Sequence, residues 1–533
     1  MNGAAAWAAL VCLTAGLLLA AFFLLAIHNL DYPGMWWDEA TQFWVSQGIS
    51  RYSPSFCRSG GVRDVVRMNC LENLDPGGFS ILLHAWTKCG CGLVWLRTLP
   101  LVFFIVGALA LGLLGWRLTR SVLFALGACA VPSLYPAALY FGLEIRAYSM
   151  EMAGVTVGAL ALAYAQERPR PARAFLLGLT CAAFLTSRYS FIFVALVLGA
   201  ALVSLCARDA HRRSAASCVV AFLVPVGLIA VPVWWVTLRY QLWNEMRGGP
   251  LGITSPGYTR TAILGHGVNA LELIGRNLFT PAALPITACI FAAVFVRRRV
   301  YARLARDSHD PELGDLRSRC TMLTALIVGV QAASIMASAL GLYPWDIASR
   351  WSAYLVMLSA LAMVVLAAEA SSLVRAWLPA GPDAGFLLRH RKLLGAGVAA
   401  LVVIAGSRRA MVHRQTVEAL HRTNVALQLD RLPWASLHEH KVFVAYYEVP
   451  MVRYLYEYGP YRGRSEYPRV FRFETGPEWQ SKAPIAVRAE SIAFFVSAVP
   501  LAEAQARFPG ATLRPFGPPG SRLLAVSMPA DGS

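Results

Sequence analysis

Long apolar runs separated by short polar tracts dominate the chain up to about residue 407. The first run, at residues 6–27, is uncharged and exceeds the roughly 20 residues that cross a hydrocarbon core about 30 Å thick. Further runs lie at about residues 99–116, 121–141, 150–166, 174–187, 189–206, 216–238, 281–296, 321–342, 352–373 and 393–407. The pattern predicts an α-helical polytopic membrane protein with about 11 transmembrane helices.

A polar, aromatic-rich loop at residues 28–98 separates the first two long runs. Inside it, residues 78–91 are apolar but few, and His84 and Lys88 interrupt them. An interfacial helix fits this stretch, in which the two cationic side chains could meet a phosphate or, as we favour, snorkel towards headgroups. With a cytoplasmic N-terminus, every dense Lys/Arg tract between spans is then cytoplasmic, as the positive-inside rule requires. We therefore expect interfacial helices in a first loop that faces the extracytoplasmic side.

The pattern changes after residue 407. The long apolar runs disappear, and helical pieces at 451–458 and 501–508 alternate with strand-like pieces at 441–445, 470–473, 492–496 and 523–526. We therefore predict a transmembrane module at residues 1–407, which includes the loop 28–98, and a small extracytoplasmic α/β domain at residues 408–533.

Composition supports a membrane protein, because 57% of the residues are hydrophobic, only 15% are charged and the mean hydropathy is +0.51. The net charge of +18 could indicate binding to nucleic acid. However, the basic residues lie mainly in short tracts between apolar runs, which positive-inside topology explains better. We expect the lipid bilayer as a partner and no nucleic acid.

Cysteine usage leaves one question open. Most of the 11 cysteines lie inside predicted spans, where cysteine behaves as a small hydrophobic residue. Cys57 and Cys70 share the first loop and could form a disulfide if that loop faces an oxidising compartment.

Acidic residues in the first loop form one candidate site. Asp38 and Glu39 follow the first span, where Asp38 could cap a helix and Glu39 could lie in its first turn. A carboxylate at the membrane surface could also remove a proton from an acceptor hydroxyl, while its neighbour orients it or a metal. Asp75 begins an Asp-Pro-Gly sequence, which is turn chemistry at least as often as a ligand.

Arginine residues at the outer ends of predicted spans form a second candidate site. Arg146 and Tyr148 lie in the sequence Glu-Ile-Arg-Ala-Tyr, while Arg188 and Arg350 lie in two further outer turns. Each alone could form a structural ion pair at a helix end. Together with an acidic loop they suit transfer from a lipid phosphate, with cations for the leaving phosphate and a carboxylate for the nucleophile.

Four short motifs carry a resemblance to a known group. They are Trp-Asp-Glu-Ala at 37–40, Asp-Pro at 75–76, Arg97 with the following Leu-Pro at 99–100, and Glu-x-Arg-x-Tyr at 144–148. In order and spacing they resemble the GT-C superfamily of integral-membrane glycosyltransferases, nearest to the branch that holds protein O-mannosyltransferases and lipid A aminoarabinose transferases. The resemblance covers about residues 1–360.

The resemblance implies a GT-C fold, a sugar donor linked to undecaprenyl or decaprenyl phosphate, and direct displacement that inverts the anomeric centre. Asp38 matches the catalytic base, and Glu39 would support it or help to bind a divalent cation. Arg146 matches the arginine that faces the donor phosphate, with Tyr148 beside it. Arg188 and Arg350 would be further phosphate-binding residues. No organic cofactor is implied.

One departure concerns the metal. Many relatives carry His-Pro-Pro before the interfacial helix, whereas this chain has Asp75 in a Leu-Asp-Pro-Gly-Gly sequence. A divalent cation would then use Asp75, with His266 as a substitute ligand, although a lone histidine is more often structural.

Other functions make different demands on the sequence. A transporter or flippase of a lipid-linked or anionic substrate is the main alternative, but it would be expected to show paired halves with matching broken helices, and we find no such repeat. An acyltransferase would need a catalytic His-Asp pair, and a phosphoethanolamine transferase a large soluble metal-binding domain. The Ala-, Arg- and Gly-rich composition fits a bacterial inner membrane protein with a periplasmic C-terminal domain. The acceptor could be a lipid, a glycan or a protein.

Overall fold

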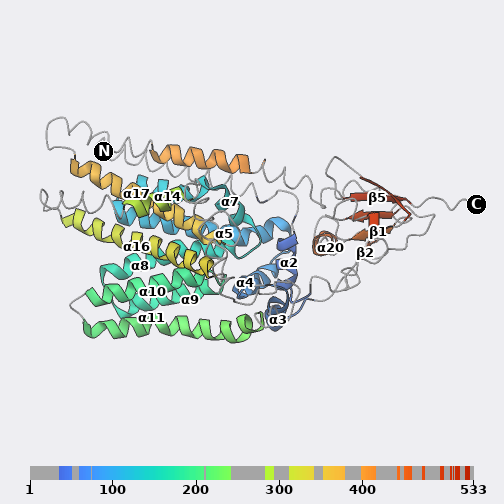
Figure 1. Cartoon of the computed structure of the whole chain (residues 1–533), viewed down its shortest axis with the longest axis horizontal. Helices are drawn as coiled ribbons and strands as arrows, with labels where there is room; N and C mark the ends of the chain where they lie inside the picture. Colours follow the sequence, from blue (N-terminus) through green and yellow to red (C-terminus); the bar gives the residue numbers. More distant parts are fainter. Residues whose placement is uncertain are drawn as a thin grey trace, which may run out of the picture. The chain divides into compact units, whose positions relative to one another are not determined.

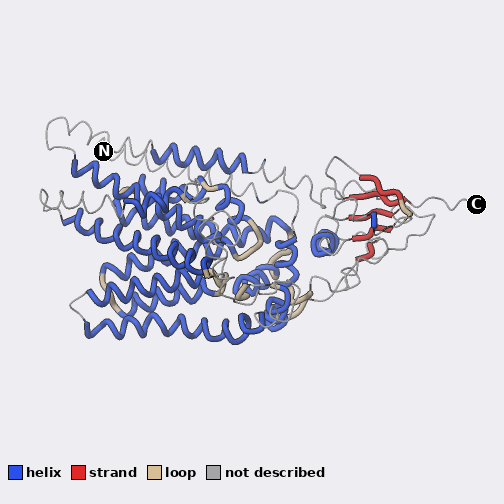
Figure 2. Tube along the Cα trace, in the orientation of Figure 1, coloured by secondary structure: helices blue, strands red, loops and turns tan. Residues whose placement is uncertain are grey.

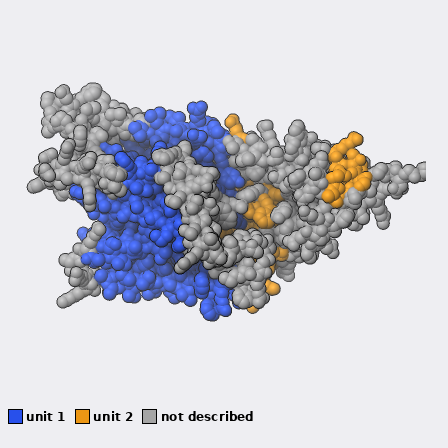
Figure 3. Space-filling view, viewed as in Figure 1, with its two compact units in different colours: residues 1–29, 100–413 blue, residues 30–99, 414–533 orange. Residues whose placement is uncertain are grey.

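We describe the fold from a computed structural model of the chain. The structure describes residues 30, 35, 37–50, 59–73, 75–208, 212–241, 283–292, 311–340, 352–377, 398–413, 415, 441–444, 449–458, 471–473, 493–496, 505–506, 508, 510–515 and 523–527. Several predictions fall outside these residues, namely those on the first span at 6–27, Cys57, His266 and Arg350. The chain divides into two compact units, residues 1–29 with 100–413 and residues 30–99 with 414–533 (Figure 3).

The first unit is a bundle of helices, several of which run side by side in Figure 1. Helix α8 (Tyr148–Glu167) is its centre, since most of its residues are buried and it packs against helices before and after it in the chain. The other helices of the bundle are α6 (Val122–Ala130), α7 (Pro136–Leu143), α9 (Pro171–Leu185), α10 (Phe191–Arg208), α11 (Arg212–Pro232), α14 (Leu284–Phe291), α16 (Pro311–Ala339) and α17 (Ala353–Trp377), together with most of α5 (Leu93–Thr119). Residues 398–413 are also helical.

Among the described residues, four helices are long and apolar enough to cross a membrane, or five if one bent pair counts as a span. The four are Leu93–Thr119, Ala215–Gln241, Gly314–Ala339 and Ala353–Ser371. This finding agrees with the predicted class of helical membrane protein. The total of about 11 spans stays a prediction, because the first span and parts of others lie outside the described residues.

The span predicted at 121–141 is broken rather than continuous. Helix α6 passes into a short 3₁₀ helix, η2 (Val131–Leu134), and the chain bends by 82° before α7. Pro132 and Pro136 explain the break, because proline lacks the backbone N–H that an α-helix needs beyond its first turn. The bend leads directly to the turn that carries Glu144 and Arg146.

The second unit contains the helices of the first loop. These are α2 (Trp37–Ser46), α3 (Val62–Glu72) and α4 (Gly78–Thr87), none of which exceeds 11 residues. A helix of that length covers about half of the roughly 20 residues that a span needs. The stretch beginning at residue 78 is thus too short to cross as a helix, in keeping with the interfacial helices that we expected.

The same unit holds a five-stranded sheet in the order β2-β1-β3-β5-β4 (Figure 2). Its strands are β1 (Lys441–Val444), β2 (Phe471–Phe473), β3 (Ala493–Val496), β4 (Thr512–Pro515) and β5 (Leu523–Ser527). Strand β1 is parallel to β2 and β3, whereas β5 is antiparallel to β3 and β4. Helix α20 (Val449–Glu457) follows β1. In the described part of the sheet, buried Leu513 pairs with buried Val526.

Candidate functional site

Helix α2 carries the two carboxylates predicted to act in catalysis. Both lie in its first turn, where the helix dipole favours negative charge. Glu39 is 0% exposed, and its Oε2 lies 3.5 Å from Nη2 of Arg97, which is also 0% exposed. Arg97 Nη1 donates a hydrogen bond to the carbonyl of Leu30 at 3.2 Å. Glu39 is therefore held by a buried ion pair, while Asp38, at 7% exposed, is the more accessible carboxylate.

A buried network of polar side chains joins α2 to α3 and α4. Gln42 Nε2 donates to Ser80 Oγ at 2.7 Å, and Asn73 Nδ2 donates to Gln42 Oε1 at 3.1 Å. Ser80 Oγ in turn donates to Asn69 Oδ1 at 2.8 Å. Satisfied networks of this kind favour one arrangement of the helices that share them.

The prediction that His84 snorkels is wrong. Its side chain is buried, and Nδ1 lies 2.7 Å from the carbonyl of Ser46 at the end of α2. A carbonyl can only accept, so Nδ1 carries the proton in this contact. Position 84 therefore links α4 to α2 rather than reaching a headgroup.

Asp75 lies in the turn before α4. Its carbonyl accepts a hydrogen bond from Asn69 Nδ2 at 2.6 Å, and its side chain is buried. Gly77 has a φ of +99°, and a Cβ there would lie 3.0 Å from Asn69 Nδ2, so the turn requires glycine. Within the described ranges, no three His, Cys, Asp or Glu residues gather as metal ligands, and His266 lies outside those ranges. The metal site formed by Asp75 and His266 therefore stays a prediction.

In the first unit, three predicted donor-site residues lie together at the start of α8. Tyr148 is the first residue of this helix and is 2% exposed. The guanidinium carbon of Arg188 lies 4.6 Å from the centre of its ring, and that of Arg146 lies 5.8 Å from it. Two cations thus share one aromatic ring, within cation–π distance. The fourth predicted residue, Arg350, falls outside the described residues.

Glu151 is a member of this group that sequence analysis missed. Its carboxylate is fully buried, with Oε2 3.7 Å from Arg188 Nη1. Its Oε1 also accepts a hydrogen bond from Ser190 Oγ. Its position inside the predicted span 150–166 could have identified it, because ionisable residues within spans are costly and usually functional. The structure thus gives Arg188 a carboxylate partner within one turn of Tyr148.

Close helix packing brings these groups together. A Cβ at Gly154 would lie 2.5 Å from Phe191 Cε2 and 2.7 Å from Phe184 Cγ. Phe184 is near the end of α9 and Phe191 is the first residue of α10. Glycine at this position lets both helix ends approach α8, as small residues do in membrane bundles. The turn that carries Arg188 consequently lies against Glu151.

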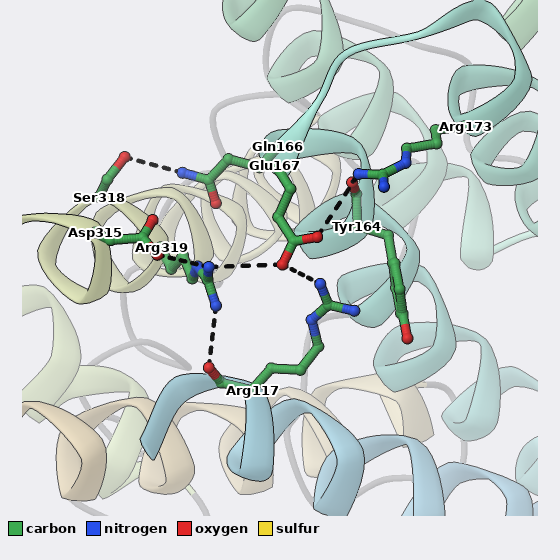
Figure 4. Close-up of polar contacts among 8 residues, drawn as sticks. All are labelled: Arg117, Tyr164, Gln166, Glu167, Arg173, Asp315, Ser318 and Arg319. Atoms are coloured by element: carbon green, nitrogen blue, oxygen red, sulfur yellow. Dashed lines mark hydrogen bonds and ion pairs between the residues drawn. The ribbon is translucent and has the colours of Figure 1, made fainter. Parts of the chain in front are cut away.

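The opposite end of α8 carries a second charged cluster, shown in Figure 4. Glu167 Oε1 accepts a hydrogen bond from Arg117 Nη2 and lies 3.5 Å from Arg319 Nη2, while its Oε2 lies 3.7 Å from Arg173 Nη1. Arg319 also pairs with Asp315 at 2.6 Å and donates to the carbonyl of Arg117 at 3.0 Å. One carboxylate therefore joins the ends of α5, α8, α9 and α16.

Electrostatics keep Glu167 ionised. Partial burial acts to raise the pKa of its carboxyl, but the hydrogen bond from Arg117 and the charges of the three surrounding arginines outweigh that effect. The pKa of Glu167 is consequently lowered from its usual value. The cluster and the residues around Tyr148 lie at opposite ends of α8. The end that carries Glu167 is the one predicted to be cytoplasmic.

The apolar helices that are long enough to cross a membrane, together with the bent pair before α8, identify the class as a polytopic helical membrane protein. Among solved structures, the chain matches the crystal structure of ArnT from Cupriavidus metallidurans in the apo state, with a TM-score of 0.50. The two sequences are 14% identical, and the match covers 98% of each chain. No family model matches this chain. No curated protein matches its sequence. The structural match shows the fold alone, which is that of ArnT, and this fold agrees with the one that the resemblance in the sequence led us to expect.

Proposed function

We propose that this protein is a membrane glycosyltransferase that moves a sugar from a polyprenyl phosphate-linked donor to an acceptor on the extracytoplasmic face. The observation that carries the proposal is the group formed by Arg146, Arg188 and Tyr148 in a chain with the GT-C fold. Two guanidinium groups at one helix end can bind the oxygens of a phosphate. They also stabilise the negative charge that a departing phosphate gains.

The proposed reaction is a single displacement at the anomeric carbon. The acceptor hydroxyl oxygen forms a bond to this carbon while the bond to the polyprenyl phosphate oxygen breaks, which inverts the centre. The electron pair of the broken bond leaves with the phosphate, whose added charge faces Arg146. The proton of the acceptor hydroxyl passes to the carboxylate of Asp38, which acts as general base.

The other buried charges have positioning roles in this scheme. Glu39, ion-paired with Arg97, fixes the first turn of α2 next to Asp38. Glu151 holds Arg188 at the Tyr148 ring. A divalent cation, held by Asp75 and His266 as the sequence predicts, would neutralise phosphate charge near the first loop. Location in a bacterial inner membrane and an extracytoplasmic C-terminal domain belong to the same proposal.

Transfer from radiolabelled polyprenyl phosphate sugars to endogenous acceptors in membranes tests the proposal. The variants are Asp38→Asn and Arg146→Ala, with Arg168→Ala as a matched control because this arginine is exposed at the end of α8. Loss of the base should lower the rate by about 10²–10⁴-fold. Loss of a charged donor to the leaving phosphate should lower it by about 10²-fold or more. Arg168→Ala should retain activity.

The outcomes separate the parts of the proposal. Full activity of folded Asp38→Asn would leave Asp38 as a helix-terminal residue without a catalytic role. Full activity of Arg146→Ala would remove the donor phosphate site from the start of α8. No turnover with any donor would favour transport of a lipid-linked substrate instead.

A further inference from the structure

Helix α20 of the C-terminal segment packs directly on α2, the helix that carries Asp38 and Glu39. Trp44 Nε1 donates a hydrogen bond at 2.9 Å to the carbonyl of Pro450, which is 406 residues away in sequence. The guanidinium carbon of Arg453 lies 3.8 Å from the centre of the Trp44 ring. Trp44 is 0% exposed and Arg453 is 1% exposed, so this is a buried cation–π contact.

Arg453 is held on several sides. Its Nε donates to Glu457 Oε1 at 2.8 Å, and its Nη1 donates to the carbonyl of Ser50, beyond the end of α2, at 3.3 Å. A buried guanidinium is costly unless its environment compensates for lost hydration. Here the compensation comes partly from α20 itself and partly from the first loop. The two segments therefore stabilise the buried charge together.

Aromatic packing extends the same interface. Phe43 of α2 meets Tyr454 edge to face, with ring centres 4.9 Å apart, and Tyr458 at 5.1 Å. The Tyr454 hydroxyl donates to the carbonyl of Cys91 at 2.8 Å. Such aromatic pairs stabilise an interface beyond the area they bury. The interface between α2 and α20 therefore combines aromatic packing with hydrogen bonds and a buried cation–π contact.

We propose that α20 is a positioning element, which orders α2 through Arg453 and Trp44 and thereby fixes the place of its two carboxylates. Helix α2 has only 10 residues, and isolated helices shorter than about 12–15 residues are marginal in water, so its order depends on packing. The structural part of this inference rests on the contacts alone. Its catalytic part rests on the proposed function of Asp38.

The expected kinetic effect falls on turnover. Misplacement of a catalytic group by about 1 Å can cost about 10²-fold in rate. We expect a loss of this order in kcat when α20 no longer orders α2. The KM for the donor should stay within about twofold, because the proposed phosphate-binding residues Arg146 and Arg188 belong to the other unit.

The experiment compares full-length variants by hydrogen–deuterium exchange of residues 37–46 and by transfer kinetics. Arg453→Ala removes the cation and its hydrogen bonds, whereas Trp44→Phe removes the hydrogen bond to Pro450 but keeps an aromatic ring. Arg514→Ala is the matched control, since Arg514 is exposed on β4. Faster exchange in Arg453→Ala, a smaller increase in Trp44→Phe and wild-type exchange in Arg514→Ala would support the proposal.

Wild-type exchange over residues 37–46 in both interface variants would overturn the proposal. If Arg453→Ala does not fold, Trp44→Phe decides by the same criterion. Faster exchange with a lower kcat and an unchanged donor KM would support the catalytic part as well. Faster exchange with an unchanged kcat would contradict the catalytic role proposed for α2, and not the ordering of α2 by α20.

Discussion

Replacement of Glu167 by glutamine should destabilise the protein in a pH-dependent manner. The substitution keeps the size of the side chain and removes the charge that joins Arg117, Arg173 and Arg319. The Arg117 side chain is 9% exposed and loses its carboxylate partner, which should cost about 1.5–3 kcal/mol. Arg319 keeps Asp315, and Arg173 is 30% exposed, so each should add only about 0–1 kcal/mol. We expect a total loss of about 1.5–5 kcal/mol near pH 7.

The sign of the pH dependence follows from the lowered pKa of Glu167. A group with a lowered pKa in the folded state stabilises the protein fully above its unfolded pKa, which for Glu167 is close to the ordinary value of 4.5. It loses that contribution as the pH falls through the folded pKa. The difference between wild type and Glu167→Gln should therefore be constant above about pH 6 and shrink below about pH 4.5.

Unfolding of the purified proteins in detergent, followed by near-UV circular dichroism at pH 7 and at pH 4, measures this difference. Asp315→Asn is the matched control, because it removes the same charge from the same cluster at a side chain that is 60% exposed. An i,i+4 pair of this kind should contribute only about 0.3–0.5 kcal/mol. Equal stability of Glu167→Gln and wild type at pH 7, or a difference that persists unchanged at pH 4, would refute the assigned role of Glu167.

Two further substitutions test local features. Glu151→Gln should cost about 3 kcal/mol in stability and raise the donor KM, because it leaves the buried Arg188 without its ion pair. Ser190→Ala removes one hydrogen bond to the same carboxylate, so in a parallel unfolding experiment it should cost only about 1 kcal/mol. Gly77→Ala should lower the unfolding midpoint, because an alanine at this positive φ costs about 1–2 kcal/mol. Gly92→Ala should leave the midpoint unchanged, because an added Cβ there meets nothing within 4 Å. Equal midpoints for the two variants would contradict the strain at position 77.

The hydrophobic pattern of the sequence predicted most strands of the C-terminal sheet. Strands β1, β2, β3 and β5 coincide with predicted strand-like pieces, since each consists mainly of apolar or aromatic residues. Strand β4, Thr-Leu-Arg-Pro at 512–515, was not predicted, because an arginine and a proline interrupt the pattern. Both are tolerated there because β4 ends the described strand order.

Topology predicted part of the candidate site. Arg146, Arg188 and Arg350 were expected at outer span ends around the acidic first loop, and the structure places the first two at Tyr148. Glu151 was missed because its neighbours are apolar and the run was interpreted as an ordinary span. The packing of α20 on α2 was not predicted either, since no local pattern indicates that Trp44 and Pro450 meet across 406 positions.

The close approach at Gly154 links a steric requirement to an electrostatic one. Gly154 lies three residues after Glu151 on α8, and a methyl group there would meet Phe191 and displace the start of α10. That displacement would carry Ser190 away from the Glu151 carboxylate. In homologous sequences, glycine at 154 and an acid at 151 should consequently co-vary, although the two residues share no chemistry. Position 154 has no side-chain functional group, yet its substitution should be restricted because the Glu151 carboxylate, one helical turn away, needs the hydrogen bond from Ser190.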